Sequence, residues 1–217
     1  MKKFSTTQGF TLLEGIIAIT VISIGMTGAL SLALSNLSSS EGNENRIIAA
    51  NLAREGIELV RNQRDTNWLK IDLNQSVSWD TLVSSSGQPV GPFFTPIIDP
   101  LTMTHSWSKI TTSNLSSIGG TCEGQDCITA CDVACQVYYD ATNRVYGVSD
   151  TSNPVNFQRL LTVQDICYDD PGNSESIVGL GDSCVNTKVG MLVTSIVRYD
   201  QRHRLDVVVK ERLYNWR

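Results

Sequence analysis

The feature that most constrains this chain is a long apolar run close to its N-terminus, from Phe10 to Leu34. Its 25 residues contain one charged side chain, Glu14. As a helix the run would be roughly 37 Å long, and the apolar core of a bilayer is about 30 Å thick. Lys2 and Lys3 precede the run and would stay on the cytoplasmic side. The run therefore predicts a single-pass segment in the inner (cytoplasmic) membrane, with the C-terminal domain outside.

Glu14 needs a reason for its place in this run, because a carboxylate in a membrane segment costs about 2–3 kcal/mol even on lenient insertion scales. One explanation is a side chain that reaches along the helix to the membrane edge. The run alone would also suit a signal anchor or an uncleaved signal peptide, although an ordinary secretory signal has a shorter apolar core.

The residues that precede Glu14 favour a more specific interpretation. Gly9–Glu14 reads Gly-Phe-Thr-Leu-Leu-Glu and resembles the cleavage and methylation motif of type IV prepilins and type II secretion pseudopilins. In that family a membrane aspartyl peptidase cuts after the glycine and N-methylates the new terminus. The resemblance implies cleavage between Gly9 and Phe10 and methylation at Phe10. It covers roughly residues 1–35 and departs from the family at Gly15, where a larger apolar residue is usual.

The same resemblance implies a role for Glu14 and a set of partners. In the family, the glutamate at this place pairs with the N-terminal amine of a neighbouring subunit and sets the axial register of a filament. The amine is a cation near neutral pH, and pairing relieves the desolvation of both charges. Glu14 is thus the expected assembly residue. The expected partners are prepilin peptidase, other pilin subunits and an inner-membrane assembly platform.

Length and charge limit the rest of the chain. Its 217 residues suffice for one membrane helix and one medium-sized globular domain. Loss of Lys2 and Lys3 with the leader reduces the 17 basic residues to 15, against 22 acidic ones, for a net charge of −7. Such a chain lacks the basic footprint of a general nucleic-acid-binding protein, so nucleic acid is not an expected partner.

Six cysteines all lie beyond residue 120. An even number in an exported domain predicts disulfides, although sequence does not distinguish the many pairings. Cys167 with Cys184 is the favoured pair, because it closes a loop worth about 3 kcal/mol in the chain-entropy model. The other four are expected to pair among themselves. The alternative is a zinc site, although their spacing fits no common zinc motif. The six are Cys122, Cys127, Cys131, Cys135, Cys167 and Cys184.

The N-terminal helix is expected to continue beyond the membrane as an amphipathic stripe, whose small members would let a sheet approach closely. The stretch Ala53–Asp65 also resembles PilV-like minor pilins and the pseudopilin I group. In the family part of the helix melts on entry into a filament, and Gly25 and Gly28 mark the expected place. The stripe consists of Ala49, Leu52, Ala53, Gly56, Ile57 and Val60.

Composition divides the remainder of the chain into a connector and a region of strands. Residues 68–120 are rich in Ser, Thr and Pro, and their prolines exclude long regular elements. Alternating apolar and polar residues predict antiparallel strands further on. These are residues 136–139, 144–148, 156–166, 189–199 and 205–214.

The predicted fold class is α+β: a long N-terminal helix, membrane-spanning in its first half, packed on a small antiparallel β-sheet, as in pilins. The expected parts are a prepilin leader (1–9), a transmembrane or filament-core helix (10–34), its amphipathic continuation (35–67) and a globular head (68–217). The head divides into the connector (68–120) and a disulfide-bearing sheet (121–217).

Few residues suggest catalysis or a cofactor. His105 and His203 lie in polar, loop-like settings, and no phosphate loop, HExxH or GxSxG occurs, so an enzyme is not expected. Residues 169–175 predict a solvated acidic loop, and no cofactor is expected. The alternative is a calcium site that would use Asp169, Asp170, Asn173 and Asp182.

Basic residues concentrate between Arg198 and Arg217, where they suit either contacts to DNA phosphates or the polar face of an exposed hairpin. The second interpretation is favoured.

The resemblance at the N-terminus implies that the chain is a structural subunit, a minor pilin of a type IV pilus-like filament that extends outside the cell. The alternatives are a type II secretion pseudopilin and a membrane-anchored extracellular binding domain.

Overall fold

The computed structural model covers the chain and describes residues 11–83, 87, 90–98, 105–110, 128, 131–142, 144–146, 154–169, 172, 174–199 and 205–216. The chain forms two compact units, Met1–Asn45 and Arg46–Arg217. The helix α1, Leu12–Asp72, contributes to both units. We call Arg46–Arg217 the head.

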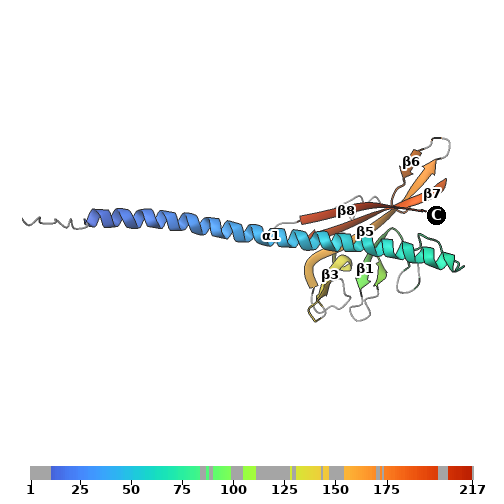
Figure 1. Ribbon diagram of the computed structural model, residues 1–217, viewed down its shortest axis with the longest axis horizontal. Coiled ribbons are helices and arrows are strands. Elements are labelled where there is room, and N and C mark those ends of the chain that lie inside the picture. The colour runs from blue at the N-terminus through green and yellow to red at the C-terminus, as the bar shows by residue number, and fades with distance from the viewer. Residues whose placement is uncertain are drawn as a thin grey trace, which may run out of the picture. The chain divides into compact units, whose positions relative to one another are not determined.

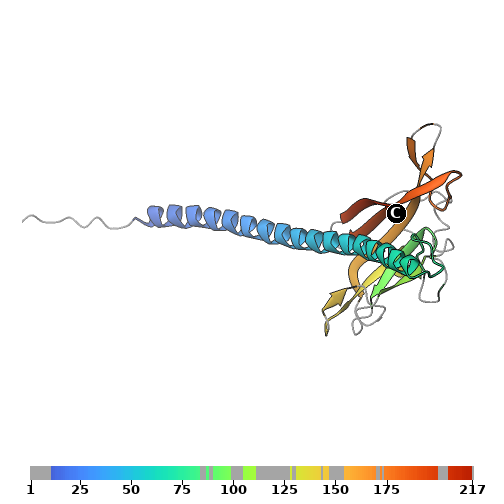
Figure 2. The ribbon, with the colours of Figure 1, turned by 45° about the vertical axis from the view of Figure 1, so that its right-hand side comes forward.

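Within the head, α1 packs on one face of an antiparallel sheet (Figures 1 and 2). The arrangement is α+β and pilin-like, as predicted. In the described part of the chain the sheet has eight strands. They are β1 (Phe93–Ile98), β2 (His105–Lys109), β3 (Gln136–Asp140), β4 (Val145–Tyr146), β5 (Pro154–Asp169), β6 (Ser174–Ile177), β7 (Thr187–Tyr199) and β8 (Leu205–Tyr214).

The long strand β5 joins the other strands. One of its edges pairs with β7 from Phe157↔Tyr199 to Tyr168↔Thr187, and β7 pairs in turn with β8. The opposite edge of β5 pairs with β3, β1 and β6, each over a short stretch. Four strands from separate parts of the chain therefore depend on one central strand for their hydrogen bonds.

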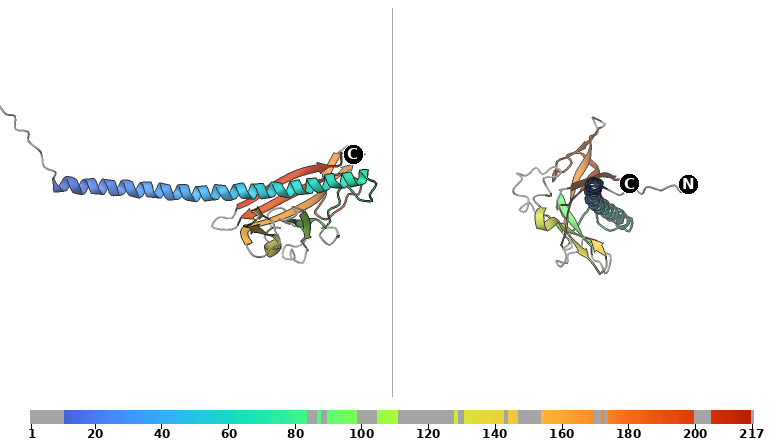
Figure 3. Two further views of the ribbon diagram at one scale, coloured as in Figure 1. Left: turned by 60° about the horizontal axis from the view of Figure 1, so that its bottom comes forward. Right: turned by 90° about the vertical axis from the view of Figure 1, so that its left-hand side faces the viewer.

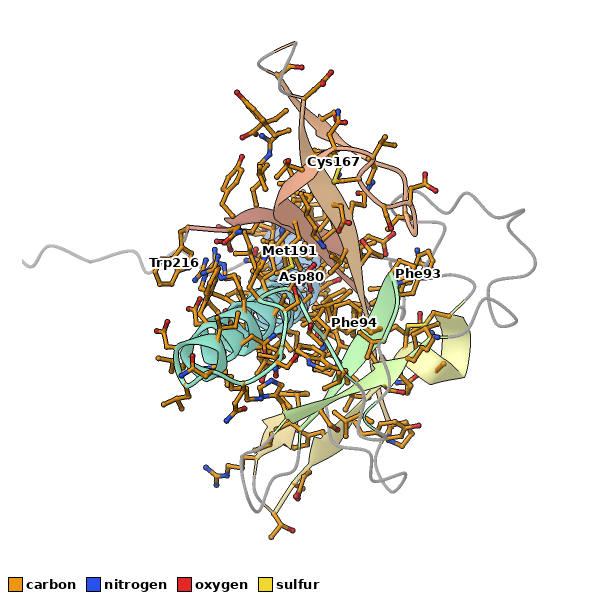
Figure 4. All side chains as sticks on the ribbon, turned by 90° about the vertical axis from the view of Figure 1, so that its right-hand side faces the viewer. Asp80, Phe93, Phe94, Cys167, Met191 and Trp216 are labelled. Atoms are coloured by element: carbon orange, nitrogen blue, oxygen red, sulfur yellow. A yellow bond between two sulfur atoms is a disulfide. The ribbon has the colours of Figure 1, made fainter. Side chains whose placement is uncertain are left out.

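The sheet buries apolar side chains on both faces. Consecutive residues of β5 illustrate this, because Leu161 packs with α1 whereas Leu160 packs on the opposite face. Phe94 and Phe93 divide in the same way, and Figure 4 shows them on opposite sides of β1. The far face is covered by residues around the short 3₁₀ helix η2 (Asp132–Cys135). The buried residues of this second cluster are Phe93, Ile110, Ile128, Cys131, Cys135, Leu160 and Ile196.

The predicted stripe of α1 is the surface that packs on the sheet. All six of its residues are buried, and three have small side chains whereas three have branched ones. The view along the helix shows α1 beside one face of the sheet (Figure 3). The contact is closest at Gly56, where an added Cβ would lie 3.1 Å from Ser195 Oγ and 3.2 Å from a methyl carbon of Leu161. A side chain at this position would separate the helix from the sheet.

Gly56→Leu should therefore destabilise the head by about 2 kcal/mol, the usual range for overpacking. All four tryptophans belong to the head, so urea unfolding of the full chain in detergent micelles, followed by tryptophan fluorescence, measures this change. Gly42→Leu is the matched control, because nothing lies within 4 Å of a Cβ at Gly42 on the same helix. Equal stability losses in the two variants would contradict the packing argument.

Two strands, β1 and β2, lie where the sequence predicts a connector. The prediction excluded long elements on account of the prolines, yet Pro96 lies inside β1. The Ile110 N–H donates to the Phe93 carbonyl (3.0 Å), and the alternation of an antiparallel ladder then turns the Pro96 nitrogen away from β2. On that side β1 pairs with β5 only at Phe93 and Phe94. Proline is tolerated because no ladder bond is lost at an edge.

The end of α1 is fixed by two asparagines. Asn74 adopts a left-handed conformation (φ 57°), and the Gln75 N–H donates to the Lys70 carbonyl (3.0 Å), which closes the last turn. The buried amide of Asn67 donates to the Thr81 carbonyl (2.8 Å). The segment that follows the helix is thereby held against it.

A partly buried charge cluster ties this segment to the sheet. Lys188 Nζ lies 2.5 Å from Asp80 and 2.6 Å from Asp165, and it also lies over the ring of Trp79. Burial alone would lower the pKa of Lys188, but its bonds to Asp165 and Asp80 raise that pKa. Burial would raise the pKa of Asp80, yet hydrogen bonds from Lys188 and Ser78 hold that pKa below its ordinary value. Lys188 and Asp80 are thus both ionised across the neutral pH range.

Candidate processing and assembly site

The residues of the predicted cleavage site, Gly9 and Phe10, lie outside the described residues. The description begins at Thr11, and α1 begins one residue later. Two residues, Phe10 and Thr11, therefore separate the predicted leader from the start of the helix in the sequence.

Thr11 is the N-cap of α1. The Glu14 N–H donates to Thr11 Oγ1 at 3.3 Å, so the hydroxyl satisfies one of the backbone donors that the first turn leaves free. Thr-Leu-Leu-Glu has the spacing of a capping box, in which an N-cap hydroxyl is followed three residues later by Glu or Gln. A carboxylate in the first turn also interacts favourably with the helix dipole. Glu14 thus helps to start the helix, whatever else it does.

The capping role was missed in the sequence. The signal was present, because the Thr-x-x-Glu spacing before an apolar run is a recognised helix start. The sequence-based expectation for Glu14 concerned its charge and its role in assembly. The two roles are compatible, since the Glu14 side chain is exposed and stays accessible to a neighbouring subunit.

The surface of α1 from residue 15 to residue 34 is apolar, and none of it is buried. Among the described residues, α1 is the one helix that is long and apolar enough to cross a membrane. Over one 18-residue window its mean hydropathy is 2.1, and 0% of that window is buried. Its few hydroxyls donate within the helix, for example Thr20 to the Ile17 carbonyl and Ser23 to the Ile19 carbonyl, both at 2.8 Å. An apolar environment therefore meets few unsatisfied polar groups on this surface.

α1 is continuous through Gly25 and Gly28 in this structure. The prediction that this part melts concerns the assembled filament, and it stays a prediction.

Four of the six cysteines form two disulfides. Cys167 bonds to Cys184, the pair that the sequence favours, and Cys131 bonds to Cys135. Neither pair is free to bind zinc. Cys122 and Cys127 lie outside the described residues.

The two ends of the predicted acidic loop lie in strands. Asp169 ends β5 and accepts a hydrogen bond from Asn186 (3.1 Å), while Glu175 lies in β6 and accepts one from the Tyr214 hydroxyl (2.9 Å). Two of the calcium candidates, Asp170 and Asn173, lie outside the described residues. Among the described residues, Asp182 and Asp169 included, no group of three or more metal-binding side chains occurs.

The C-terminal basic cluster is not one continuous surface. Arg198 is 3% exposed and forms a two-pronged ion pair with Asp206, at 2.8 and 3.1 Å, on the face of the sheet away from α1. The prediction of an exposed polar face was wrong for Arg198, because Arg198 and Asp206 neutralise each other in the interior. Lys210 and Arg212 are exposed, and Arg202, Arg204 and Arg217 lie outside the described residues.

A groove runs beside α1 in the head. It has a volume of about 590 Å³ and lies between the helix and the ends of β1, β2 and β4. A second cleft of about 470 Å³ shares Glu55, Leu59 and His105 with it and continues along the helix. The main groove is lined by Ile48, Asn51, Leu52, Glu55, Leu59, Ile98, His105, Arg144, Val145 and Tyr146.

His105 is the one histidine within the described residues. It is half-buried at the edge of the groove, and its ring packs edge-on against Trp107 with centroids 5.3 Å apart. His203 lies outside the described residues. The carboxylates near His105 are held by arginines. In the described part of the groove no serine, threonine or cysteine lies beside His105 as a nucleophile.

Comparison with known proteins bears on the N-terminal segment. Residues 5–30 match the family model described as the prokaryotic N-terminal methylation motif. No curated protein and no solved structure matches the chain. The match includes Gly9, Phe10 and Glu14, and it does not extend to the head. This segment supports a place for the chain among the type IV prepilins and pseudopilins, and the long apolar helix on an antiparallel sheet is a pilin-like arrangement.

Proposed function

We propose that the chain is a minor type IV pilin, a structural subunit that prepilin peptidase cleaves after Gly9 and methylates at Phe10. The mature protein would enter an inner-membrane-based filament through its apolar helix and present its disulfide-bearing head to the solvent. The assembly platform and other pilin subunits would be its partners.

One observation carries this proposal: the methylation motif leads directly into a capped helix whose apolar surface is wholly exposed. Such a surface is stable in a bilayer or against other apolar helices, and not in water. Cleavage and methylation at the motif would allow the segment to leave the bilayer and pack against the apolar helices of other subunits. Both features point to structural rather than catalytic work.

In the assembled state Glu14 would pair with the Phe10 amine of a neighbouring subunit. Because Glu14 also belongs to a capping box, loss of assembly in a Glu14 variant has two explanations. Two variants separate them. Glu14→Gln keeps a residue that capping boxes accept and removes the charge, whereas Thr11→Ala removes the cap and keeps the charge.

Glu14→Gln should reduce incorporation into filaments by about tenfold or more, because it leaves the Phe10 amine of the neighbouring subunit without its opposite charge in an apolar environment. Thr11→Ala should cost about 1 kcal/mol at the start of the helix and change incorporation little. Sheared surface filaments, probed for this subunit by immunoblot, provide the measurement. Equal losses in the two variants would show that capping, not charge pairing, explains Glu14.

Processing is tested on the protein extracted from membranes. Mass spectrometry should find an N-terminus at methylated Phe10, and Gly9→Leu should leave the chain uncut. A terminus at Met1, or one beyond residue 30, would refute the proposal.

A type II secretion pseudopilin is the second candidate, since it would share the same motif and processing. The large head with its disulfides favours the pilus. Deletion of the gene separates the two: surface filaments and motility should be lost while exoprotein release continues. A membrane-anchored extracellular binding domain is a third candidate, and it predicts an uncut N-terminus.

A further inference from the structure

His105 lies at a weakly held part of the head. It begins β2, whose described strand partner is β1, and β1 joins the central strand β5 only at Phe93 and Phe94. The hairpin β1–β2 therefore depends on side-chain packing for much of its attachment. Trp107, which is 1% exposed, packs in the core cluster shared with α1, and the His105 ring lies edge-on against it.

The imidazole of His105 is placed to be neutral. Its Nε2 is buried and has no hydrogen-bond partner among the residues that the structure describes. A proton on that nitrogen would create a buried cation without an acceptor, which is costly in the interior. Burial accordingly lowers the pKa of His105 from its ordinary value of 6.5.

Charged groups face His105 from two directions, and none of the carboxylates is unpaired. On α1 each carboxylate is held by an arginine: Glu55 by Arg159, Glu58 by Arg61 and Asp65 by Arg64, at 2.6, 2.6 and 2.8 Å. The turn before β4 adds a cation, Arg144, and β4 adds the Tyr146 phenol. β1 contributes uncharged Ile98 opposite His105, Lys109 lies further along β2, and Asp99 lies outside the described residues. The surroundings thus offer an imidazolium little compensation.

We propose that His105 is an acid-sensitive latch, and that its protonation loosens the β1–β2 hairpin and opens the groove beside α1. The latch does not depend on the proposed function in a filament. Ile98 and His105 form one wall of the groove, and Ile48, Leu52 and Leu59 of α1 line the other. Movement of the hairpin would therefore expose apolar surface on both sides.

The sign of the pH dependence follows from the direction of the shift. The neutral imidazole contributes its full stabilisation of the folded state above pH 6.5, which is the pKa of histidine in the unfolded chain. This stabilisation is lost as the pH falls below 6.5 toward the lower pKa of His105 in the folded state. Opening of the hairpin should then increase by up to about tenfold for each pH unit over that interval.

Hydrogen–deuterium exchange of the full chain in detergent micelles tests the latch. After correction for intrinsic exchange rates, β1 and β2 amides should open more often at pH 5.5 than at pH 7.5, by up to about tenfold. Amides at the centre of β5 and β7 should show no such change. An equal change throughout the sheet would indicate general acid unfolding and would overturn the proposal.

The decisive variant is His105→Phe, which keeps a ring against Trp107 and cannot be protonated. It should abolish the pH dependence of β1 and β2, and His105→Gln serves the same purpose if the phenylalanine variant does not fold. His203→Gln removes the chain's other histidine and should leave the dependence intact. A pH dependence that survives in the folded His105 variant, or that disappears in His203→Gln, refutes the latch.

Discussion

Glu55→Ala is expected to destabilise the head by about 3 kcal/mol, although alanine is the best helix former. The reason is the partner of Glu55. Arg159 is 0% exposed, and its Nη1 donates to Glu55 at 2.6 Å and to the Leu52 carbonyl at 3.3 Å. Without Glu55 the guanidinium would remain buried with no opposing charge. We place the loss at the low end of the usual 3–5 kcal/mol because Glu55 itself is 38% exposed.

The reverse substitution should behave differently. Arg159→Met replaces the buried cation by an apolar side chain of similar length and leaves Glu55 free to face solvent. It also removes two buried nitrogens, Nε and Nη2, that have no hydrogen-bond partner. The change in stability should be within about 1 kcal/mol of zero, or favourable. The double variant should resemble Arg159→Met alone, because the cost of Glu55→Ala exists only while Arg159 is present.

Urea unfolding of the full chain in micelles, followed by tryptophan fluorescence, measures all three variants. The free energies of unfolding then form a double-mutant cycle. If Arg159→Met destabilised the head as much as Glu55→Ala, the ion pair would be a net source of stability, and the asymmetry argued here would be wrong.

Removal of the Cys167–Cys184 disulfide is expected to cost about 3 kcal/mol. The bond links residues 17 apart, and the chain-entropy model gives this value for a loop of that length. The native contacts within the loop are few, because all four residues of β6 are exposed. Most of the loss should therefore come from greater freedom of the unfolded chain.

The double variant Cys167→Ala/Cys184→Ala tests this expectation under non-reducing conditions. Its midpoint in urea should fall, while exchange at the centre of β7 before unfolding should be unchanged. The matched control is Cys131→Ala/Cys135→Ala, which opens a loop of only four residues and should lose about 2 kcal/mol from loop closure. A loss below about 1 kcal/mol in the first variant would mean that β5–β6 pairing closes the loop unaided.

The sequence predicts those parts of the fold that follow from local pattern. The stripe from Ala49 to Val60 is buried as helical spacing requires, and β7 and β8 lie within two residues of their predicted bounds. Alternation identifies these strands because each has one face against α1. The motif at the N-terminus likewise depends only on neighbouring residues.

The parts that were missed depend on contacts between distant residues. β1 contains Pro96, and that proline is harmless only because β1 pairs with β5 no further than Phe94. Asp206 reads as an outward residue of an alternating strand, yet Arg198 on β7 buries it. The groove and the place of His105 arise where α1 meets β2 and β4, and no local pattern encodes that meeting.

The pairing of β5 also dictates when the head can form. β1, β2 and β3 are synthesised before β5, and they have no complete sheet until β5 and then β7 follow. The outer part of α1 must wait still longer for the residues of β7 and β8 that cover it. Contacts between such distant residues slow folding and leave apolar surface open in the meantime. The apolar helix is thus synthesised first, and the sheet that covers part of it is synthesised last. A chaperone that binds the nascent helix would therefore protect this protein most during synthesis.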